Sequence, residues 1–429
     1  MSVPGADNGA GFRDADCVSY YRTIRAGVPA DARQIGYGVN KMPPARPVRR
    51  WLTALYGDLL DDRVTDYSTP ADVPERALVA SLAGQYLAVP GLAPEDVFFC
   101  HGTTEAISIV LGYAGQRGWG AVLPLPLYCS FEQSAARHRV PVIGHYNASG
   151  QLAAGRPAGR PLLLVDIAPN GVSGSWFDTP VTGEPALRIV DHVFALPTYQ
   201  PAPAFVAEVR GRIGDLSRTA VLLTPSKDLS IPGLRCGTLI TRHPGLRAYL
   251  HADRFERGYT VGVGTPRIAA AHLALLLLAF VPEAGAEPLR RAFTAAGVPF
   301  LTDPDCAAFL AHQADMAHRA VTNIGLLDGT GFLTPVTGTH AAGFSGFRRI
   351  AGSAPGADDF TGWIQDAGRA GLKLNPNYLF GGGPAQWQAL YPGGHGIRVN
   401  VSVPPDELAT DLALLRQLLP AWARTYATA

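Results

Sequence analysis

Short apolar runs alternate with amphipathic stretches through the middle of the chain, a pattern that is typical of an α/β sheet. The apolar runs are short enough to be buried strands, and amphipathic stretches between several of them predict helices. The predicted strands are 96–100, 121–128, 140–145, 161–167, 186–194 and 219–223. The predicted helices start after residue 103 and cover 130–139 and 203–213. This alternation predicts a mostly parallel sheet with functional groups at the carboxyl ends of its strands.

Outside this central region, the sequence predicts mostly helices rather than alternating strands and helices. Helices are predicted over 18–26, 47–60, 73–87, 246–255, 266–281, 287–296 and 405–419, a shaped loop over 34–44 and a strand over 396–402. The predicted fold class is therefore α/β: a three-layer large domain with a mostly parallel sheet, plus a smaller α+β C-terminal domain. The predicted boundaries are a loosely attached arm over 1–34, the large domain over 35–285 and the small domain over 286–429. Residues 35–66 are expected to pack with the small domain.

Composition removes several classes of function. The net charge is +1 and only 17% of residues are charged, so neither nucleic acid nor a membrane is expected as a partner. Five spaced cysteines include no C-x-x-C pair, which argues against a zinc site or disulfide framework and favours the cytoplasm. The N-terminus lacks the pattern of a signal peptide. The longest apolar run, 268–281, is too short to cross a bilayer.

One lysine is unusual in its surroundings. The chain has only three lysines, and Lys227 follows directly after a predicted strand. Its neighbours Thr224 and Ser226 carry hydroxyls, and Arg235 adds a guanidinium eight residues later. A lysine at a buried strand's end, flanked by groups that bind phosphate, is a candidate nucleophilic amine. The alternative is a loop lysine that reaches solvent.

Other chemical groups also follow predicted strands. Gly102, Thr103 and Thr104 form a strand-to-helix turn whose unpaired backbone N–H groups can bind an anion. Tyr128 and Asp191 lie at the ends of two further strands. Taken singly, these groups fit an ordinary turn, a core aromatic and a helix cap or buried ion pair. Together they predict a site for a planar, phosphorylated, aldehyde-bearing ring.

A longer motif resembles a known family. Ser-Lys-x-x-x-x-Pro-Gly-x-Arg stands at Ser226–Arg235, and Asp191 precedes Lys227 by 36 residues. In these features the chain, from Gln34 onward, resembles the fold-type I pyridoxal 5′-phosphate enzymes of aminotransferase class I/II, the aspartate aminotransferase-like family. The resemblance implies that Lys227 forms the Schiff base and moves the Cα proton. It also implies that Asp191 holds a proton on the ring nitrogen of pyridoxal phosphate.

The resemblance assigns further residues around the cofactor. Tyr128 would stack on its ring. The phosphate would be bound by Gly102, Thr103, Thr104, Thr224, Ser226 and Arg235 of one subunit and by Tyr67 of its neighbour in a homodimer. The family's glycine five residues after that tyrosine is Asp72 here, which makes the assignment of Tyr67 weaker.

The resemblance also assigns a substrate site. Arg398, in Ile-Arg-Val-Asn-Val, would bind the α-carboxylate of an amino acid, with a 2-oxo acid as co-substrate. Gly38 would lie in a loop that closes over this carboxylate. A surface arginine is the alternative for Arg398.

Two departures separate this chain from the family's pattern. The family's donors to the cofactor's phenolic oxygen, an asparagine and a tyrosine, are Gly171 and Phe194 here, and Asn170 is the only substitute nearby. With fewer donors, the Schiff base should stay protonated and yellow at neutral pH and above. The departures favour a specialised reaction, so elimination or replacement, decarboxylation and oxidative deamination stand beside transamination. A non-catalytic, cofactor-binding regulator is a weaker alternative.

Other classes of enzyme lack their motifs. No G-x-G-x-x-G follows a strand, and no H-E-x-x-H occurs. His101 and His192 lie beside cofactor positions, where either could tune the ring or be a structural histidine. The segments 375–383 and 387–395 are rich in glycine and aromatic residues and are candidate lids.

Overall fold

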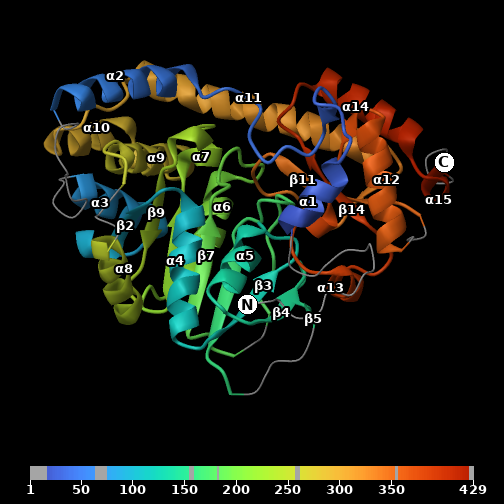
Figure 1. Cartoon of the computed structure of the whole chain (residues 1–429). Helices are drawn as coiled ribbons and strands as arrows, with labels where there is room; N and C mark the ends of the chain where they lie inside the picture. Colours follow the sequence, from blue (N-terminus) through green and yellow to red (C-terminus); the bar gives the residue numbers. More distant parts are fainter. Residues whose placement is uncertain are drawn as a thin grey trace.

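The computed structural model divides into a large part built on one long sheet and a smaller part rich in the C-terminal third of the sequence (Figure 1). The residues that the structure describes are 17–62, 75–153, 159–180, 183–256, 261–352 and 356–424. Tyr67 and Asp72 lie outside these residues, so the role predicted for Tyr67 stays a prediction.

The large part is an eight-stranded sheet, which confirms the predicted fold class. Its order across the sheet is β2 (Val97–Cys100), β9 (Gly237–Ile240), β8 (Thr219–Leu223), β7 (Leu187–His192), β6 (Leu162–Ile167), β3 (Gly120–Pro124), β4 (Val142–Tyr146) and β5 (Leu152–Ala153). The strands from β8 to β4 are parallel, whereas β9 and β5 run antiparallel to their neighbours. The parallel register brings the carboxyl ends of β6, β7 and β8 to one edge.

One strand ends earlier than the sequence predicts. The run 121–128 leaves the sheet at Pro124 and continues as a loop. Pro124 and Pro126 lack backbone N–H groups, so this segment cannot continue a central ladder. The amide of Leu127 instead donates to Phe380 O at 2.9 Å, which ties the loop to the small part.

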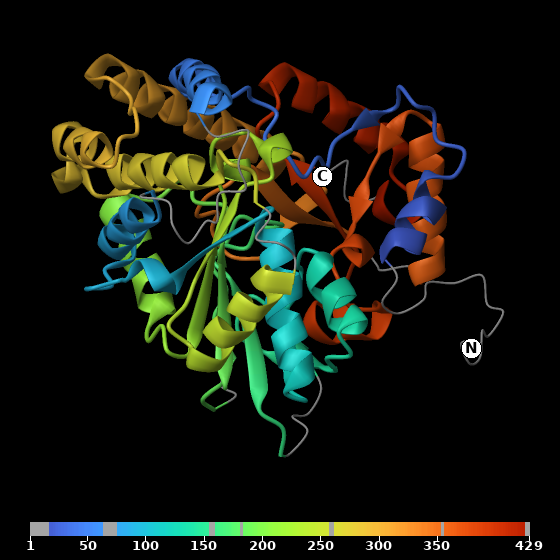
Figure 2. The ribbon, with the colours of Figure 1, turned by 60° about the vertical axis from the view of Figure 1, so that its left-hand side comes forward.

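Helices cover both faces of the sheet, as Figure 2 shows. One face packs on α4 (Thr103–Gln116), α5 (Ser130–Arg137) and α8 (Pro244–Glu256); the other packs on α3 (Glu75–Leu87), α6 (Ala202–Ile213) and α9 (Thr265–Phe280). The longest apolar run in the sequence is α9, which is buried along almost its whole length. Because neither side of this helix faces solvent, it carries no amphipathic pattern.

The smaller part is an antiparallel sheet backed by helices. Its strand order is β10 (Leu333–Pro335), β11 (Ser345–Ile350), β14 (Gly396–Asn400) and β13 (Asn375–Pro376), and its helices are α12 (Ala357–Arg369), α13 (Pro384–Leu390), α14 (Pro405–Leu418) and α15 (Ala421–Arg424). This sheet confirms the predicted α+β character of the C-terminal third. The domain boundaries themselves stay predictions.

A long helix that the sequence does not predict joins the two parts. Helix α11 (Asp303–Asp328) runs across the top of the molecule in Figure 1, beside α2 (Arg46–Asp62) and after α10 (Ala286–Ala295). Thr302 caps its first turn by accepting a hydrogen bond from Asp305 N. At its far end, buried Asn323 donates to Val401 O at 2.9 Å and Val403 O at 2.8 Å. The helix therefore reaches the small sheet after starting beside the large one.

The described part of the predicted N-terminal arm, residues 17–34, packs on the small part. Helix α1 (Cys17–Arg25) packs on α12, where Tyr20 Oη lies 3.3 Å from Thr361 Oγ1 and Ile24 is fully buried. Strand β1 (Arg33–Gln34) then pairs in parallel with β12 (Leu372–Lys373). Long-range pairing of this kind leaves no local signal in a polar stretch of sequence.

Among the described residues, no helix is both long and apolar enough to cross a membrane. The same residues contain no group of three or more metal-ligating side chains. Neither observation conflicts with the predicted site for an organic cofactor.

Candidate active site

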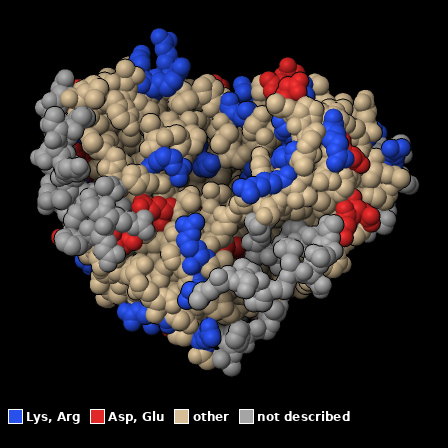
Figure 3. Space-filling model, viewed as in Figure 1, with Lys and Arg blue, Asp and Glu red and all other residues tan. Residues whose placement is uncertain are grey.

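A cavity of about 470 Å³ opens where the carboxyl ends of the large sheet's strands meet the small part. Figure 3 shows basic side chains gathered around a hollow on this face. The cavity brings together most of the residues predicted for the site: Gly38, Gly102, Thr103, Thr104, Tyr128, Asp191, Phe194, Thr224, Ser226, Lys227, Arg235 and Arg398. Asn170 does not line it.

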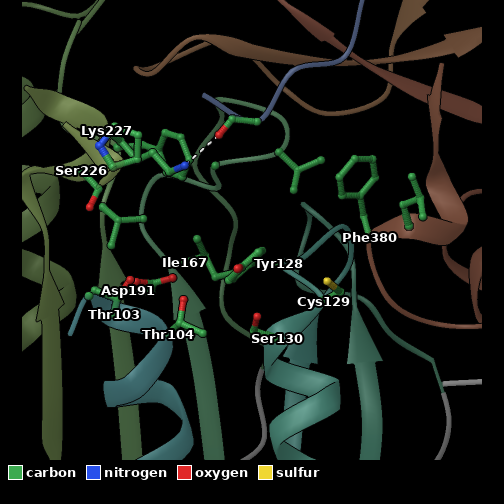
Figure 4. Close-up of a pocket in the computed structure, with 18 of the residues that line it drawn as sticks. Thr103, Thr104, Tyr128, Cys129, Ser130, Ile167, Asp191, Ser226, Lys227 and Phe380 are labelled. Carbon is green, nitrogen blue, oxygen red and sulfur yellow. Dashed lines mark hydrogen bonds between the residues drawn. The ribbon is translucent and has the colours of Figure 1, made fainter. Parts of the chain in front are cut away.

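Asp191 and His192 are adjacent on β7, and only Asp191 faces the cavity. Successive residues of a strand point to opposite faces. Asp191 points to the α4 side and lines the cavity, close to Thr103 in Figure 4. His192 points to the other side, where its Nδ1 lies 2.6 Å from Ala168 O and its Nε2 lies 2.8 Å from Tyr86 Oη. His192 is therefore a hydrogen-bonded core residue, outside the cavity lining.

Asp191 has an unsatisfied oxygen. The side chain is buried, and Oδ1 has no hydrogen-bond partner among the residues that the structure describes. Burial raises the pKa of this carboxyl to about 7. A buried carboxylate oxygen without a partner is costly, and it suits a positively charged N–H group supplied by a ligand. The alternative readings of Asp191 as a cap or an ion-pair partner have no support in this geometry.

Lys227 reaches into the cavity from the short helix α7 (Pro225–Asp228). Thr224 fixes the start of this helix, because its Oγ1 accepts a hydrogen bond from Ser226 N at 3.2 Å. The lysine Nζ donates to Gly38 O at 2.7 Å (Figure 4). Desolvation lowers the pKa of Lys227 to about 8, and the guanidinium groups of Arg398 and Arg235 act in the same direction. The side chain is half-buried, so it is not a loop lysine extended into solvent.

The Gly102 turn and Arg235 form a concave basic wall. Gly102 has a φ of +75°, and a Cβ there would lie 2.8 Å from an Arg235 guanidinium nitrogen. A Cβ on Gly237 would lie 2.9 Å from Thr103 N. Two positions therefore have to be glycine for the backbone N–H groups of the α4 start to lie beside a guanidinium. Such an arrangement binds phosphate.

Arg398 lies on the small-part side of the cavity. Its guanidinium lies 4.7 Å above the Phe380 ring and donates to Gly36 O at 3.0 Å. Gly38 lies against the same group, because a Cβ there would be 2.9 Å from Nη2. Desolvation lowers the pKa of Arg398 to about 10, which leaves it charged at neutral pH. It is not a surface arginine.

The two departures from the family's pattern are physically coupled. A Cβ on Gly171 would lie 1.9 Å from Cε2 of Phe194, so the Phe194 ring occupies the space that a side chain at position 171 would need. Any side chain there would require the ring to move. An apolar ring edge thus replaces two hydrogen-bond donors, and both residues line the cavity.

Asn170 does not take over the missing asparagine's role in this geometry. It is fully buried, and its Nδ2 donates to Pro126 O at 2.7 Å. Its Oδ1 accepts from the amides of Val172 and Ser173 at 3.0 and 3.3 Å. The side chain stabilises two loops beside the cavity, and the prediction of a cofactor contact is not supported.

Several cavity residues were not predicted from the sequence. Helix α1 contributes Cys17, Val18 and Tyr21, the α5 side contributes Cys129, Ser130 and Gln133, and the small part contributes Asn375, Leu379 and Phe380. The glycine- and aromatic-rich segment 375–383 carried a signal for the last group. No local pattern marks α1 as a cavity wall.

The second candidate lid, segment 387–395, does not line the cavity. Trp387 donates to Gly381 O at 2.7 Å, and Asn147 of the large part donates to Leu390 O at 3.1 Å. This segment joins the two parts away from the cavity lining. Tyr128, by contrast, is 49% exposed and lines the cavity, so its stacking role stays a prediction.

Solved structures share this architecture at low sequence identity. A probable N-succinyldiaminopimelate aminotransferase from Thermus thermophilus superposes with a TM-score of 0.62 and 18% identity, covering 94% of this chain and 99% of its own. An aspartate aminotransferase double mutant from the same organism gives 0.65 and 16%, covering 95% and 97%. An aminotransferase from Mycobacterium tuberculosis gives 0.63 and 16%, covering 98% and 100%.

This chain has the aminotransferase fold. The fold predicted from the resemblance is thereby confirmed over nearly the whole length. No protein-family model matches the sequence, and no curated protein matches it. The aminotransferase fold therefore carries a sequence far from those of its structural neighbours, and function has to be argued from the cavity.

Proposed function

We propose that the protein is a pyridoxal phosphate-dependent enzyme that acts on an α-amino acid, with transamination to a 2-oxo acid co-substrate as its default reaction. The observation that carries this proposal is the unpartnered, buried Oδ1 of Asp191, in the same cavity as the half-buried amine of Lys227. A protonated pyridine nitrogen would satisfy that oxygen. An amine with a pKa near 8 suits covalent attachment to an aldehyde at neutral pH.

The other walls fit the rest of this cofactor. The turn at Gly102 and the guanidinium of Arg235 would hold its phosphate, and the hydroxyls of Thr224 and Ser226 lie 2.8 Å apart beside it. When bound, pyridoxal phosphate supplies an electron-withdrawing ring that stabilises negative charge at the Cα of an amino acid. All of the residues to which this proposal gives a role line the cavity, except Tyr67, which lies outside the described residues.

The chain's own residues would divide the work. Arg398 would bind the α-carboxylate, and its stacking on Phe380 fixes the guanidinium in place. Lys227 Nζ would take the proton from Cα and return it elsewhere. Asp191 would keep the ring nitrogen protonated. Gly38, next to both Lys227 and Arg398, would close the loop over the substrate.

The remaining lining suits a neutral side chain on the substrate. Beyond the groups already assigned, the described lining holds Val18, Tyr21, Gln133, Leu379 and Phe380, none of which is charged. A second carboxylate on the substrate would have no cation of its own in the described part of the cavity. Neutral amino acids should therefore be better substrates than aspartate or glutamate.

An alternative outcome of the same site rests on Gly171 and Phe194. The Phe194 ring leaves the cavity without the two donors that the family's pattern places there. Weaker control of the phenolic oxygen favours chemistry other than amino transfer, including elimination, decarboxylation or oxidative deamination. The identity of the product distinguishes these reactions.

The test is spectroscopic. The purified protein loaded with pyridoxal phosphate should show a visible band that changes when a neutral amino acid is added. Formation of the amine form of the cofactor together with a 2-oxo acid indicates transamination, whereas ammonia or carbon dioxide indicates the alternatives. Lys227→Ala should lose the band and the covalent attachment, while Lys373→Ala, a substitution of a partly exposed lysine on β12 outside the cavity lining, should keep both. A Lys227→Ala protein with the original band would contradict the proposal.

A further inference from the structure

Two cysteines from opposite sides of the cavity meet at its wall. Cys17 is the first residue of α1, which packs on the small part, and Cys129 is the N-cap of α5 in the large part. Both line the cavity, although more than 100 residues separate them in the sequence. Figure 4 shows Cys129 above the first turn of α5, next to Tyr128.

Hydrogen bonds connect the two cysteines. Gln133 lies one turn along α5. Its side-chain Nε2 donates to Cys17 Sγ at 3.0 Å, and its backbone N–H donates to the backbone carbonyl of Cys129 at 3.1 Å. The Cys17 thiol is hydrogen-bonded to Cys129 and lowers the pKa of the Cys129 thiol, and the Arg398 guanidinium acts in the same direction. A lowered pKa raises the thiolate fraction, which is the reactive form.

The other cysteines differ from this pair. Cys100, Cys236 and Cys306 are all buried, whereas Cys17 and Cys129 are partly exposed. Cys100 and Cys306 belong to separate apolar clusters of the core. Burial raises the pKa of the Cys236 thiol, which makes it inert. Oxidants should therefore reach one pair of thiols in this chain.

We propose that Cys17 and Cys129 are a redox modification site, where a reversible disulfide fastens α1 to the start of α5 and closes the cavity. Hydrogen peroxide would supply the oxidant. The Cys129 thiolate attacks the peroxide oxygen, forming a sulfenic acid and releasing water after protonation. The Cys17 thiol then attacks the sulfenic sulfur, forming the S–S bond and releasing a second water. A dithiol reverses the bond by exchange.

The bond would act on access to the site. Helix α1 is anchored to α12 of the small part, while Cys129 follows Tyr128 in the large part. A covalent link between them spans the two walls and prevents their separation. Because the cavity lies between those walls, entry and release of an amino acid should slow. This consequence rests on the proposed function; formation of the bond does not.

The first experiment maps the bond. Purified full-length protein is treated with hydrogen peroxide, blocked with an alkylating reagent, digested and analysed by mass spectrometry without reduction. We expect one linked pair of peptides, containing Cys17 and Cys129, two hydrogens lighter than the separate peptides. Cys306→Ser should keep this pair, while Cys17→Ser and Cys129→Ser should lose it. Absence of the linked pair in the wild type, or links between different chains in its place, would overturn the proposal.

A second experiment measures the consequence. Oxidation should raise the melting temperature of the wild type by about 2–5 °C, because the link closes a long loop. It should also slow the spectral change induced by an amino acid several-fold. Dithiothreitol should reverse both effects, and Cys17→Ser should show neither. A linked protein with unchanged melting temperature would overturn the proposal that the disulfide fastens α1 to α5. A protein that links and stabilises but never responds to any amino acid would contradict the proposed function alone.

Discussion

The buried carboxyl group of Asp191 destabilises the folded protein when the cofactor is absent. Its pKa is raised to about 7 in the folded state, against about 3.9 in an unfolded chain. The folded state therefore binds a proton more tightly, and stability is lost as pH rises from about 4 through 7. Asp191→Asn should stabilise the cofactor-free protein by about 1–4 kcal/mol at pH 8, and by less at pH 5.

Urea unfolding of the cofactor-free wild type and of Asp191→Asn at the two pH values checks this expectation. Asp178→Asn, at an exposed carboxylate, is a control that should show little dependence on pH. An equal difference between Asp191→Asn and the wild type at pH 5 and pH 8 would refute the assignment of the raised pKa to Asp191. The same variant should bind pyridoxal phosphate more weakly, because the partner of its ring nitrogen is lost.

Phe194 should set the colour of the loaded enzyme. With an apolar ring edge in place of a donor, the Schiff base at Lys227 should stay protonated, so the visible band should persist from neutral pH upward. Phe194→Tyr returns a hydroxyl to the cavity and should lower the pKa of the band by about one unit. Absorbance titration of both proteins measures this, and Phe344→Tyr, beside Phe194 but not on the lining, is the matched control. A wild-type band that disappears between acidic and neutral pH would contradict the prediction.

At the scale of elements, the sequence predicts what local pattern encodes. The strand that carries Asp191 and the strand that precedes Lys227 have short apolar runs, and the structure contains them as β7 and β8. The motif around Lys227 also correctly predicted the edge of the sheet where the carboxyl ends of the strands lie. The coupling between Gly171 and Phe194 needed coordinates, since only the distance between them shows that one residue occupies the other's space.

Distant contacts determine what the sequence did not predict: the position of α1, although a helix is predicted over 18–26, and the existence of α11. Helix α1 is polar on its exposed face, and its place over the cavity depends on α12, far along the chain. Helix α11 has both buried and exposed positions spread along its length, and buried Gln313 and Asn323 interrupt its apolar face. Periodicity is a weak guide to such helices, because tertiary contacts determine which positions are buried.

The segment from Asn375 to Phe380 should control substrate affinity. Phe380 lies 4.7 Å from the Arg398 guanidinium, and a cation–π contact of this kind contributes about 0.5–2 kcal/mol. Phe380→Ala should raise the KM for the amino acid roughly 3- to 30-fold with a smaller change in kcat, because the arginine loses its support. Phe380→Tyr should keep the contact and the KM. An unchanged KM in Phe380→Ala would show that Gly36 alone positions the guanidinium.

At the scale of the molecule, the cavity depends on the packing of both parts. Arg398 and Phe380 come from the small part, while Asp191 and Lys227 come from the large sheet. The peptide between them, around Gly38, contacts both Lys227 and Arg398. Relative motion of the two parts would therefore change substrate and cofactor contacts together.

The predicted homodimer can be tested by exchanging subunits. If Tyr67 completes the neighbour's phosphate site, Lys227→Ala and Tyr67→Phe should each impair activity when alone. In mixed dimers, one site carries both substitutions and the other carries neither, so random mixing should restore about a quarter of the wild-type sites. Activity after co-refolding, with the mass of the assembly from analytical ultracentrifugation, measures this. Mixing Lys227→Ala with Asp191→Asn is the control, since both residues belong to the same subunit's cavity. Each site of that mixed dimer carries one of the two substitutions, so the activity of this control should stay at background. Recovery in the mixture of Lys227→Ala and Tyr67→Phe that does not exceed this control would contradict the assignment of Tyr67.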